Sequence, residues 1–295
     1  MIEEEEKENF DIDWLSERYP FDVEARDKAL ESKVIAHLAK KSSITLVDVG
    51  AGTGSNCLYF VEQFPQTQKW YLVEQNEELK KATIKRLRDY ANYHKYNFER
   101  KKDTIKINST KRNITITILN DSLLNLADLV DLKKIDLVLA NAVFDLFSAA
   151  QIDQLVSLIT QNKLAFYHTL SYEGMLFNPA DPFDDVFVTA YNEHMERPQD
   201  FGKALGRHAS QYMVKLFEAT EGTVQSATSL WKIQPMDIKM HYYLLSFMEN
   251  ALAEMDLAPA MQENFKKWIK RKKDLIITGQ QHLEIAHMDI FVQPK

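Results

Sequence analysis

A glycine-rich stretch early in the chain constrains the fold most strongly. Residues 44–56 read ITLVDVGAGTGSN. Apolar and β-branched residues, interrupted only by Asp48, predict a short buried strand, and Gly50, Gly52 and Gly54 follow it at once. Apolar residues at helical spacing then continue to residue 64. A strand, a glycine loop and a helix in this order let the backbone approach a ligand closely, because glycine has no Cβ and accepts positive φ.

The spacing of the glycines narrows the choice of ligand. A dinucleotide fingerprint reads G-x-G-x-x-G, whereas this loop reads G-x-G-x-G, with Asp48 two residues before the first glycine. Residues 70–73 predict a second strand that ends in Glu74, 20 residues after Gly54. A carboxylate at that strand end can accept hydrogen bonds from both hydroxyls of a ribose. The alternative is a tight turn beside a buried core acid.

Loop, preceding aspartate and strand-end glutamate together resemble the first motif of class I S-adenosylmethionine (SAM)-dependent methyltransferases. The resemblance implies SAM as cofactor, with the loop beneath its methionine and ribose parts, the strand acid near its amine and an acid after the third strand at its adenine. The whole chain, including LSYEG, FGKALG and HMDIF, is also similar to a set of bacterial methyltransferase-like proteins. The cofactor-binding residues that follow from the resemblance are Asp48, Gly50, Ala51, Gly52, Thr53, Gly54, Asn56, Glu74, Asn120, Asp121, Ser122, Asn141 and Phe144.

The remaining periodicity predicts an α/β fold of the Rossmann-like kind. We expect a seven-stranded sheet in the order 3-2-1-4-5-7-6, with helices on both faces, and residues 97–113 as an extended connector. The later strands are predicted at residues 114–119, 135–140, 164–170, 224–233 and 284–293. Helices are predicted at residues 10–40, divided at Pro20, and at 77–93, 151–161, 184–195, 208–220, 237–255 and 259–277.

All 295 residues are expected to form a single domain with three additions. Residues 1–40 form a helical cap in which Trp14, Arg18 and Tyr19 either cover the cofactor or pack in the core. Residues 171–207 and 235–281, the second a helical insertion between the last two strands, are candidate lids over a substrate.

The fourth strand ends in NAVFDLF, at the edge of the sheet where ligands gather in such folds. Enzymes that methylate base or glutamine nitrogens often carry an acid or amide, two prolines and an aromatic there, so NAVF argues against those acceptors. Asn141, Phe144 and Asp145 either contact the cofactor or the acceptor at this edge, or only cap and pack the following helix. After the third strand, Asp121 either binds the adenine or is the N-cap of the next helix, a role that Ser122 could take instead. The candidates for a base that removes a proton from the acceptor are Asp145, His168, Tyr172, His208 and His287, the last with a purely structural alternative.

Composition excludes several other classes of protein. The single cysteine, Cys57, excludes a disulfide framework, and the eight histidines lack metal-ligand spacing, so no metal is expected. The acidic start MIEEEEKENF has no basic signal region and no apolar run is long enough for a membrane span, so the cytoplasm is expected and no membrane partner. The net charge is −7, yet residues 80–112 hold twelve Lys or Arg and three acids, and a second basic run spans 266–273. These runs are solvated faces or bind an anionic partner such as RNA.

The first hypothesis is therefore an enzyme that transfers a methyl group from SAM to the oxygen or nitrogen of a small molecule. An RNA or protein methyltransferase is the second, favoured only by the basic segment. A non-catalytic module that binds SAM or a nucleotide is the third, and a dehydrogenase is the fourth.

Overall fold

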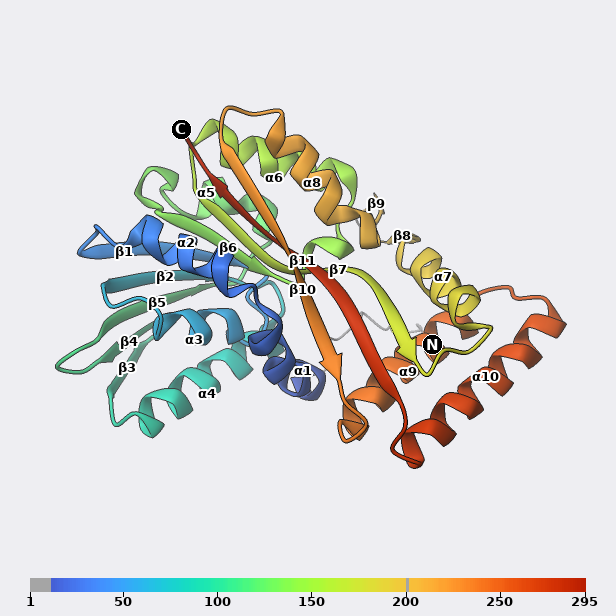
Figure 1. Cartoon of the computed structure of the whole chain (residues 1–295). Coiled ribbons are helices and arrows are strands. Elements are labelled where there is room, and N and C mark those ends of the chain that lie inside the picture. The colour runs from blue at the N-terminus through green and yellow to red at the C-terminus, as the bar shows by residue number, and fades with distance from the viewer. Residues whose placement is uncertain (1–11, 200–201) are drawn as a thin grey trace, which may run out of the picture.

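The structure, a computed structural model, describes residues 12–199 and 202–295. Its centre is a nine-stranded sheet in the order β10-β11-β7-β6-β1-β2-β5-β4-β3 (Figure 1). The five central strands are parallel and pair in neighbouring order from β5 to β7, whereas β11, β10, β4 and β3 are antiparallel to their neighbours. The strands are β1 (Ser43–Val49), β2 (Thr67–Val73), β3 (Asn97–Lys101), β4 (Thr104–Asn108), β5 (Asn113–Leu119), β6 (Leu137–Asn141), β7 (Phe166–Asn178), β10 (Thr223–Ile233) and β11 (His282–Gln293).

Helices cover both faces of this sheet, as predicted. One face packs against α2 (Lys28–Leu38), α3 (Ser55–Val61) and α4 (Glu77–Tyr93). The other packs against α5 (Leu126–Leu129), α6 (Ala149–Gln161) and α8 (Ala209–Glu218). The central strands alternate between the two apolar layers, so that Leu46 enters the first and Val47 the second. This three-layer arrangement holds the carboxyl ends of β1, β2 and β6 at one edge of the sheet.

The expected count of seven strands is wrong, because residues 97–108 form a hairpin rather than a connector. β3 and β4 extend the sheet beyond β5. Two short strands of two residues each, β8 (Pro198–Gln199) and β9 (Gly202–Lys203), form a separate small sheet. The hairpin forms because Ile105 and Ile107 alternate with polar residues and bury their side chains in the first apolar layer. The remaining strands lie in the order β5-β2-β1-β6-β7-β11-β10.

Two other boundaries differ from the prediction. Pro20 lies inside α1 (Ile12–Ala25) rather than between two helices, and the break falls at Arg26, where the Asp27 side chain caps α2 by accepting from Leu30 N at 2.6 Å. The loss of one backbone donor at Pro20 is tolerated because α1 is held by tertiary packing of Trp14. Residues 171–178, expected to leave the sheet as part of a lid, instead continue β7.

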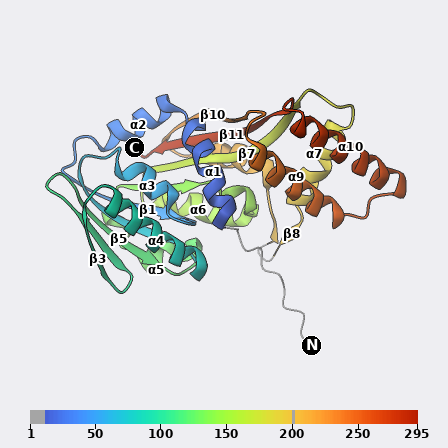
Figure 2. The same cartoon turned by 90° about the horizontal axis from the view of Figure 1, so that it is seen from below.

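The far halves of β7, β10 and β11 leave the three-layer core and build a second lobe. There they pack with α7 (Asp184–Met195), α9 (Ile238–Ala253) and α10 (Pro259–Ile277) around a separate apolar cluster (Figures 1 and 2). The helical insertion between the last two strands is therefore confirmed. A buried ion pair joins α7 to α10, with Lys272 Nζ 2.7 Å from Asp184 Oδ1, which also accepts a bond from Trp268 Nε1 at 2.7 Å.

Helix α1 connects the two lobes. Its Trp14 ring lies 6.0 Å from the ring of Trp231 on β10 and 4.9 Å from that of Phe247 on α9. The same helix presents Leu15 to the glycine loop of the sheet lobe, 3.8 Å from where a Cβ on Gly52 would lie. Whatever binds at the loop therefore lies under α1.

Candidate cofactor site and its surroundings

The glycine loop between β1 and α3 adopts a conformation that other residues rarely take. Gly50, Gly52 and Gly54 have φ of 65°, 55° and 74°. A Cβ on Gly50 would lie 2.9 Å from Val143 Cγ2, and one on Gly54 would lie 2.8 Å from Thr83 Cγ2, so these two glycines are required by packing. A Cβ on Gly52 would meet only Leu15, at 3.8 Å, so packing does not require glycine at this position.

Glu74 lies directly after β2, beside this loop. Its Oε2 accepts a bond from Gly52 N at 2.8 Å, and its Oε1 accepts one from Asn76 N at 2.8 Å. Burial raises the pKa of the carboxyl, while those backbone donors oppose the rise. Each carboxylate oxygen can accept more than one bond, so the pair of oxygens remains suited to a vicinal diol.

A buried chain of polar side chains leads away from Asp48. Asn56 Nδ2 donates to Asp48 Oδ1 at 2.8 Å, and Arg26 Nη2 donates to Asn56 Oδ1 at 2.8 Å. Arg26 also reaches Asn141 Oδ1 at 3.3 Å. The predicted residues Asp48, Asn56 and Asn141 thus meet around one guanidinium.

Arg26 was missed by the sequence analysis. It is 3% exposed and lies over the rings of Tyr59 and Phe60, with its Cζ at 4.5 and 5.2 Å from the ring centres. Its Nε and Nη1 have no hydrogen-bond partner, and no carboxylate of the described residues forms an ion pair with it. Buried charges are normally paired, so a guanidinium with two free donors indicates an anion-binding position.

Asp48 complements this cation. Its Oδ2 is buried and has no partner among the described residues, and burial raises the pKa of the carboxyl to about 7, against the effects of Asn56 and Arg26. A small shift in surroundings is therefore enough to ionise it at neutral pH. An unpaired acceptor beside an unpaired guanidinium can bind both ends of an α-amino acid.

The third strand end, after β5, has a looser arrangement. Asp121 Oδ1 accepts from Ser122 N at 2.7 Å and from Asn125 Nδ2 at 2.8 Å, while Ser122 Oγ accepts from Leu124 N and caps the following turn. Ser122, rather than Asp121, is thus the N-cap. Asn120 Nδ2 donates to Glu77 Oε1, so this edge is tied to the start of α4.

Three further predicted residues have structural contacts. Thr53 accepts a bond from Arg86 Nη1, which the sequence analysis also missed and which comes from α4. Phe144 is fully buried in the second apolar layer, 4.8 Å from the His168 ring. Ala51 is buried, and its N donates to Val73 O at 3.1 Å, which fixes the loop to β2.

The five candidate bases do not lie together. His168 is fully buried, and burial lowers its pKa to about 3, so it is a neutral core residue. The His208 side chain is 55% exposed and lies 3.4 Å from Glu196. Neither belongs to the cofactor site.

Asp145, Tyr172 and His287 do lie near one another, since the rings of Tyr172 and His287 are 6.4 Å apart and the Asp145 charge acts on Tyr172. Burial raises the pKa of Asp145 and lowers that of His287 to about 3, and the Arg18 charge acts on both groups. Asp145 Oδ1 and His287 Nδ1 are buried without a partner in the described parts of the chain, whereas Tyr172 OH donates to Asn192 Oδ1 at 2.9 Å. Two unfilled acceptors here suit a ligand that brings a hydroxyl or amino hydrogen.

α1 joins this cluster to the cofactor residues. Arg18 lies over the Trp231 ring at 4.9 Å and donates to Asp22 Oδ1 at 3.1 Å. Asp22 Oδ2 in turn accepts from Asn141 Nδ2 at 3.4 Å. Of the predicted lid residues, Arg18 therefore lies between the two sites, Tyr19 lies under the Arg86 guanidinium, and Trp14 is core.

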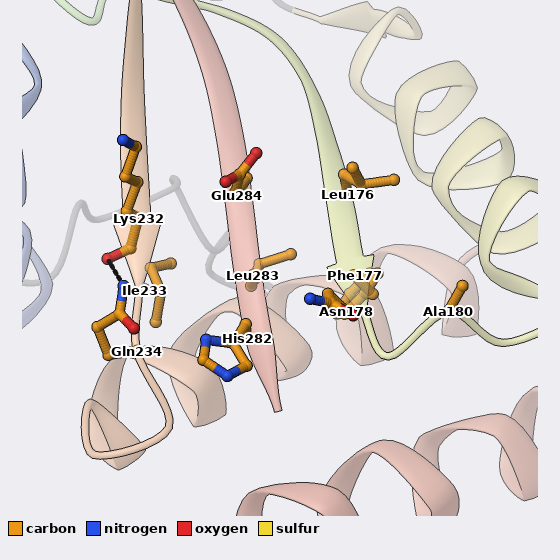
Figure 3. A pocket seen from close by; sticks show the side chains of 10 residues that line it. All are labelled: Leu176, Phe177, Asn178, Ala180, Lys232, Ile233, Gln234, His282, Leu283 and Glu284. Carbon is orange, nitrogen blue, oxygen red and sulfur yellow. Dashed lines mark hydrogen bonds between the residues drawn. The ribbon is translucent and has the colours of Figure 1, made fainter. Parts of the chain in front are cut away.

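A separate cavity of about 400 Å³ lies at the far end of the second lobe (Figure 3). Leu176, Glu284 and Lys232 stand side by side on β7, β11 and β10 above it, and His282 marks its end. None of the predicted site residues lines it. The described residues also hold no group of three potential metal ligands, and no helix among them is long and apolar enough to cross a bilayer.

No family model and no curated protein matches this chain. Solved structures do match over most of its length. The YcgJ protein from Bacillus subtilis is 14% identical with a TM-score of 0.47, and the match covers 90% of this chain and 97% of that one. The cyclopropane synthase MmaA2 from Mycobacterium tuberculosis is 10% identical with a TM-score of 0.43, and the match covers 92% of this chain and 93% of that one.

The mycolic acid cyclopropane synthase CmaA1 is a third match, and its structure contains S-adenosylhomocysteine (SAH). It is 15% identical with a TM-score of 0.43, over 89% of this chain and 84% of that one. Identities from 10% to 15% and TM-scores from 0.43 to 0.47 carry no conclusion about the activity or ligand of this chain.

Proposed function

We propose that the chain binds SAM at the glycine loop and transfers its methyl group to a small molecule. The observation that carries the proposal is Arg26, a buried guanidinium with two free nitrogens beside the unpaired Asp48 Oδ2. Together they fit the carboxylate and ammonium of an α-amino acid. Glu74, which follows Gly52 by 22 residues and accepts a hydrogen bond from its backbone N–H, fits the diol of a ribose. An amino acid joined to a nucleoside is the chemical description of SAM.

The fit distinguishes SAM from a dinucleotide. A pyrophosphate needs a loop of the G-x-G-x-x-G form at a helix N-terminus and no ammonium ligand. Here an acidic side chain lies directly before the loop, where it would repel a phosphate. Asp121 and its neighbours Asn120 and Ser122 are proposed to face the adenine, because they follow the strand next to β2.

SAM supplies a methyl group on a sulfonium, which is already activated, so the protein mainly has to align the acceptor and exclude water. The α1 helix excludes water by covering the loop. We assign removal of the acceptor proton to Asp145, because its buried Oδ1 has no partner among the described residues and burial lowers the pKa of the neighbouring His287 to about 3. His287 Nδ1 and Tyr172 are assigned to orient a hydroxyl or amino group.

The whole chain is proposed to act as one domain, with α7 and residues 235–281 enclosing the acceptor. In support of this, β10 and α9 of the second lobe pack against α1, and Arg18 lies over Trp231 of β10. An acceptor reaching Asp145 would therefore lie between α1 and the second lobe.

Titration calorimetry with SAM, SAH and NADH tests cofactor choice. We expect SAM and SAH to bind with one site each and NADH not to bind. Incubation with methyl-labelled SAM and a fractionated small-molecule extract then tests transfer, with the protein lacking the Asp145 carboxylate (Asp145→Asn) as control. Binding of NADH in place of SAM would overturn the cofactor assignment, and SAM binding without labelled product would overturn the catalytic one.

A further inference from the structure

The two basic runs of the sequence differ in how many of their cations are paired with carboxylates. In the run on α10, Lys272 is buried against Asp184, Arg271 binds Asp181 through two hydrogen bonds, and Lys273 lies 2.8 Å from Glu249. Three of the six charges of that run are therefore neutralised within the second lobe, whereas Lys266, Lys267 and Lys270 are exposed. The three paired cations serve to attach α10 to the rest of the second lobe.

The run on α4 and the β3–β4 hairpin pairs Lys80, Lys81 and Arg112 with carboxylates but leaves other cations without such a partner in the described parts of the chain. A groove of about 410 Å³ lies between α4 and the hairpin, with Ile84 among its lining residues. Its only two acids, Glu77 and Asp103, both pair with Lys80, at 3.5 and 3.1 Å. Three exposed cations of the lining, Lys85, Arg88 and Arg100, have no carboxylate partner within the described residues.

Protection of a sheet edge explains only part of this charge. β3 is an edge strand, and charged residues on such strands prevent pairing with other chains. Either sign of charge would serve that purpose, and the protection does not require cations on α4. Lys81, Lys85 and Arg88 nevertheless follow one face of α4 at helical spacing, toward the hairpin.

We propose that this groove binds a single-stranded nucleic acid through its phosphates. The protein carries −7 overall, so a polyanion would be repelled elsewhere and attracted to this concave surface. A concave surface lined by cations without carboxylate partners fits the phosphates of a flexible nucleic acid strand more closely than it fits a flat anionic membrane.

The groove is independent of the acceptor site proposed above. β5, β2, β1 and β6 separate β4 from β7, on which Tyr172 lies. The opposite face of α4 supports the glycine loop, where Thr83 Oγ1 donates to Gly52 O at 2.9 Å. The strand would thus dock behind the cofactor loop, and SAM binding should not depend on the groove cations.

Fluorescence anisotropy with labelled 20-nucleotide single-stranded RNA and DNA tests the proposal. If Lys85, Arg88, Arg100 and one neighbouring cation each neutralise a phosphate, the logarithm of the association constant falls with the logarithm of the salt concentration with a slope of about −3. The affinity should then fall about 50-fold between 50 and 200 mM salt. The triple variant Lys85→Glu, Arg88→Glu, Arg100→Glu should lose binding by at least about 30-fold.

The matched control is Lys266→Glu, Lys267→Glu, Lys270→Glu on α10, which changes the net charge equally. It should stay within about threefold of the wild type. Equal losses in both variants would overturn the proposal, as would no binding of either strand at 50 mM salt. Binding to phosphatidylserine vesicles that displaces the strand would also overturn it, in favour of a membrane surface. SAM binding measured by calorimetry should be unchanged in the groove variant, so that loss of nucleic acid binding can be told apart from failure of the cofactor proposal. If the triple glutamate variant does not fold, the triple glutamine variant at the same positions replaces it.

Discussion

Replacing Arg26 with methionine should remove SAM binding with little effect on folding. Methionine fills a similar volume, and the deleted charge is buried with Nε and Nη1 unpaired. Removal of a buried charge without a carboxylate partner relieves a desolvation cost. Loss of the Nη2 bond to Asn56 and of the contact with Tyr59 acts in the opposite direction. We therefore expect the free energy of unfolding to change by less than about 2 kcal/mol.

The effect on binding should be much larger. Two charge-assisted hydrogen bonds from the free nitrogens to a carboxylate are worth about 1.5–3 kcal/mol each in a buried site. A loss of about 3 kcal/mol or more corresponds to at least about 150-fold weaker SAM binding. Titration calorimetry measures this directly, and a denaturant melt measures stability on the same sample.

Methylthioadenosine provides the control ligand, since it has the nucleoside and sulfur of SAM but no carboxylate. Its affinity should be the same for the wild type and for Arg26→Met, to within about twofold. Equal weakening of both ligands would mean that Arg26 only supports the shape of the loop. Unchanged SAM affinity would refute the anion-binding role altogether.

Three further predictions concern the loop and the second lobe. SAM should bind about 15-fold more tightly at pH 7.0 than at pH 5.5, because the Asp48 carboxyl has a pKa of about 7 and only its ionised form binds the ammonium; calorimetry of Asp48→Asn should show no such rise. Gly52→Ala should weaken SAM binding. Gly279→Ala, at a similar φ of 65° and with no neighbour within 4 Å, should leave SAM binding intact. In a denaturant melt each substitution should lower the free energy of unfolding by ~1 kcal/mol. Asp184→Asn should lower the free energy of unfolding by about 3–5 kcal/mol, since it breaks the buried ion pair between α7 and α10, while the exposed Asp185→Asn should change it by less than about 0.5 kcal/mol. An equal effect of the two substitutions would contradict that assignment.

Local patterns predicted the elements whose burial follows from their own residues. β1 and β2 lie where apolar runs precede the glycine loop and Glu74, with Asp48 inside the first run, and α10 has the predicted bounds. In contrast, the hairpin at residues 97–108 was missed because its charged residues hide the alternation of Ile105 and Ile107. A charge count over the segment cannot show which faces are buried.

The parts of the site that depend on packing between distant segments were not predictable. Arg26 lies in an ordinary helical sequence, and only the turn between α1 and α2 carries it under the loop. The same holds for Asp289, which accepts bonds from Asp27 N and Leu170 N and so fixes that turn to the sheet. The sequence indicates neither role, because Arg26 meets Asn56 and Asn141, and Asp289 meets Asp27 and Leu170, only after distant segments have packed together.

A crystal structure with SAH tests the central claim most directly. SAH should lie under α1, with its carboxylate at Arg26 Nε and Nη1, its amine at Asp48 and its ribose hydroxyls at Glu74. SAH bound elsewhere, or a carboxylate turned away from Arg26, would contradict the account.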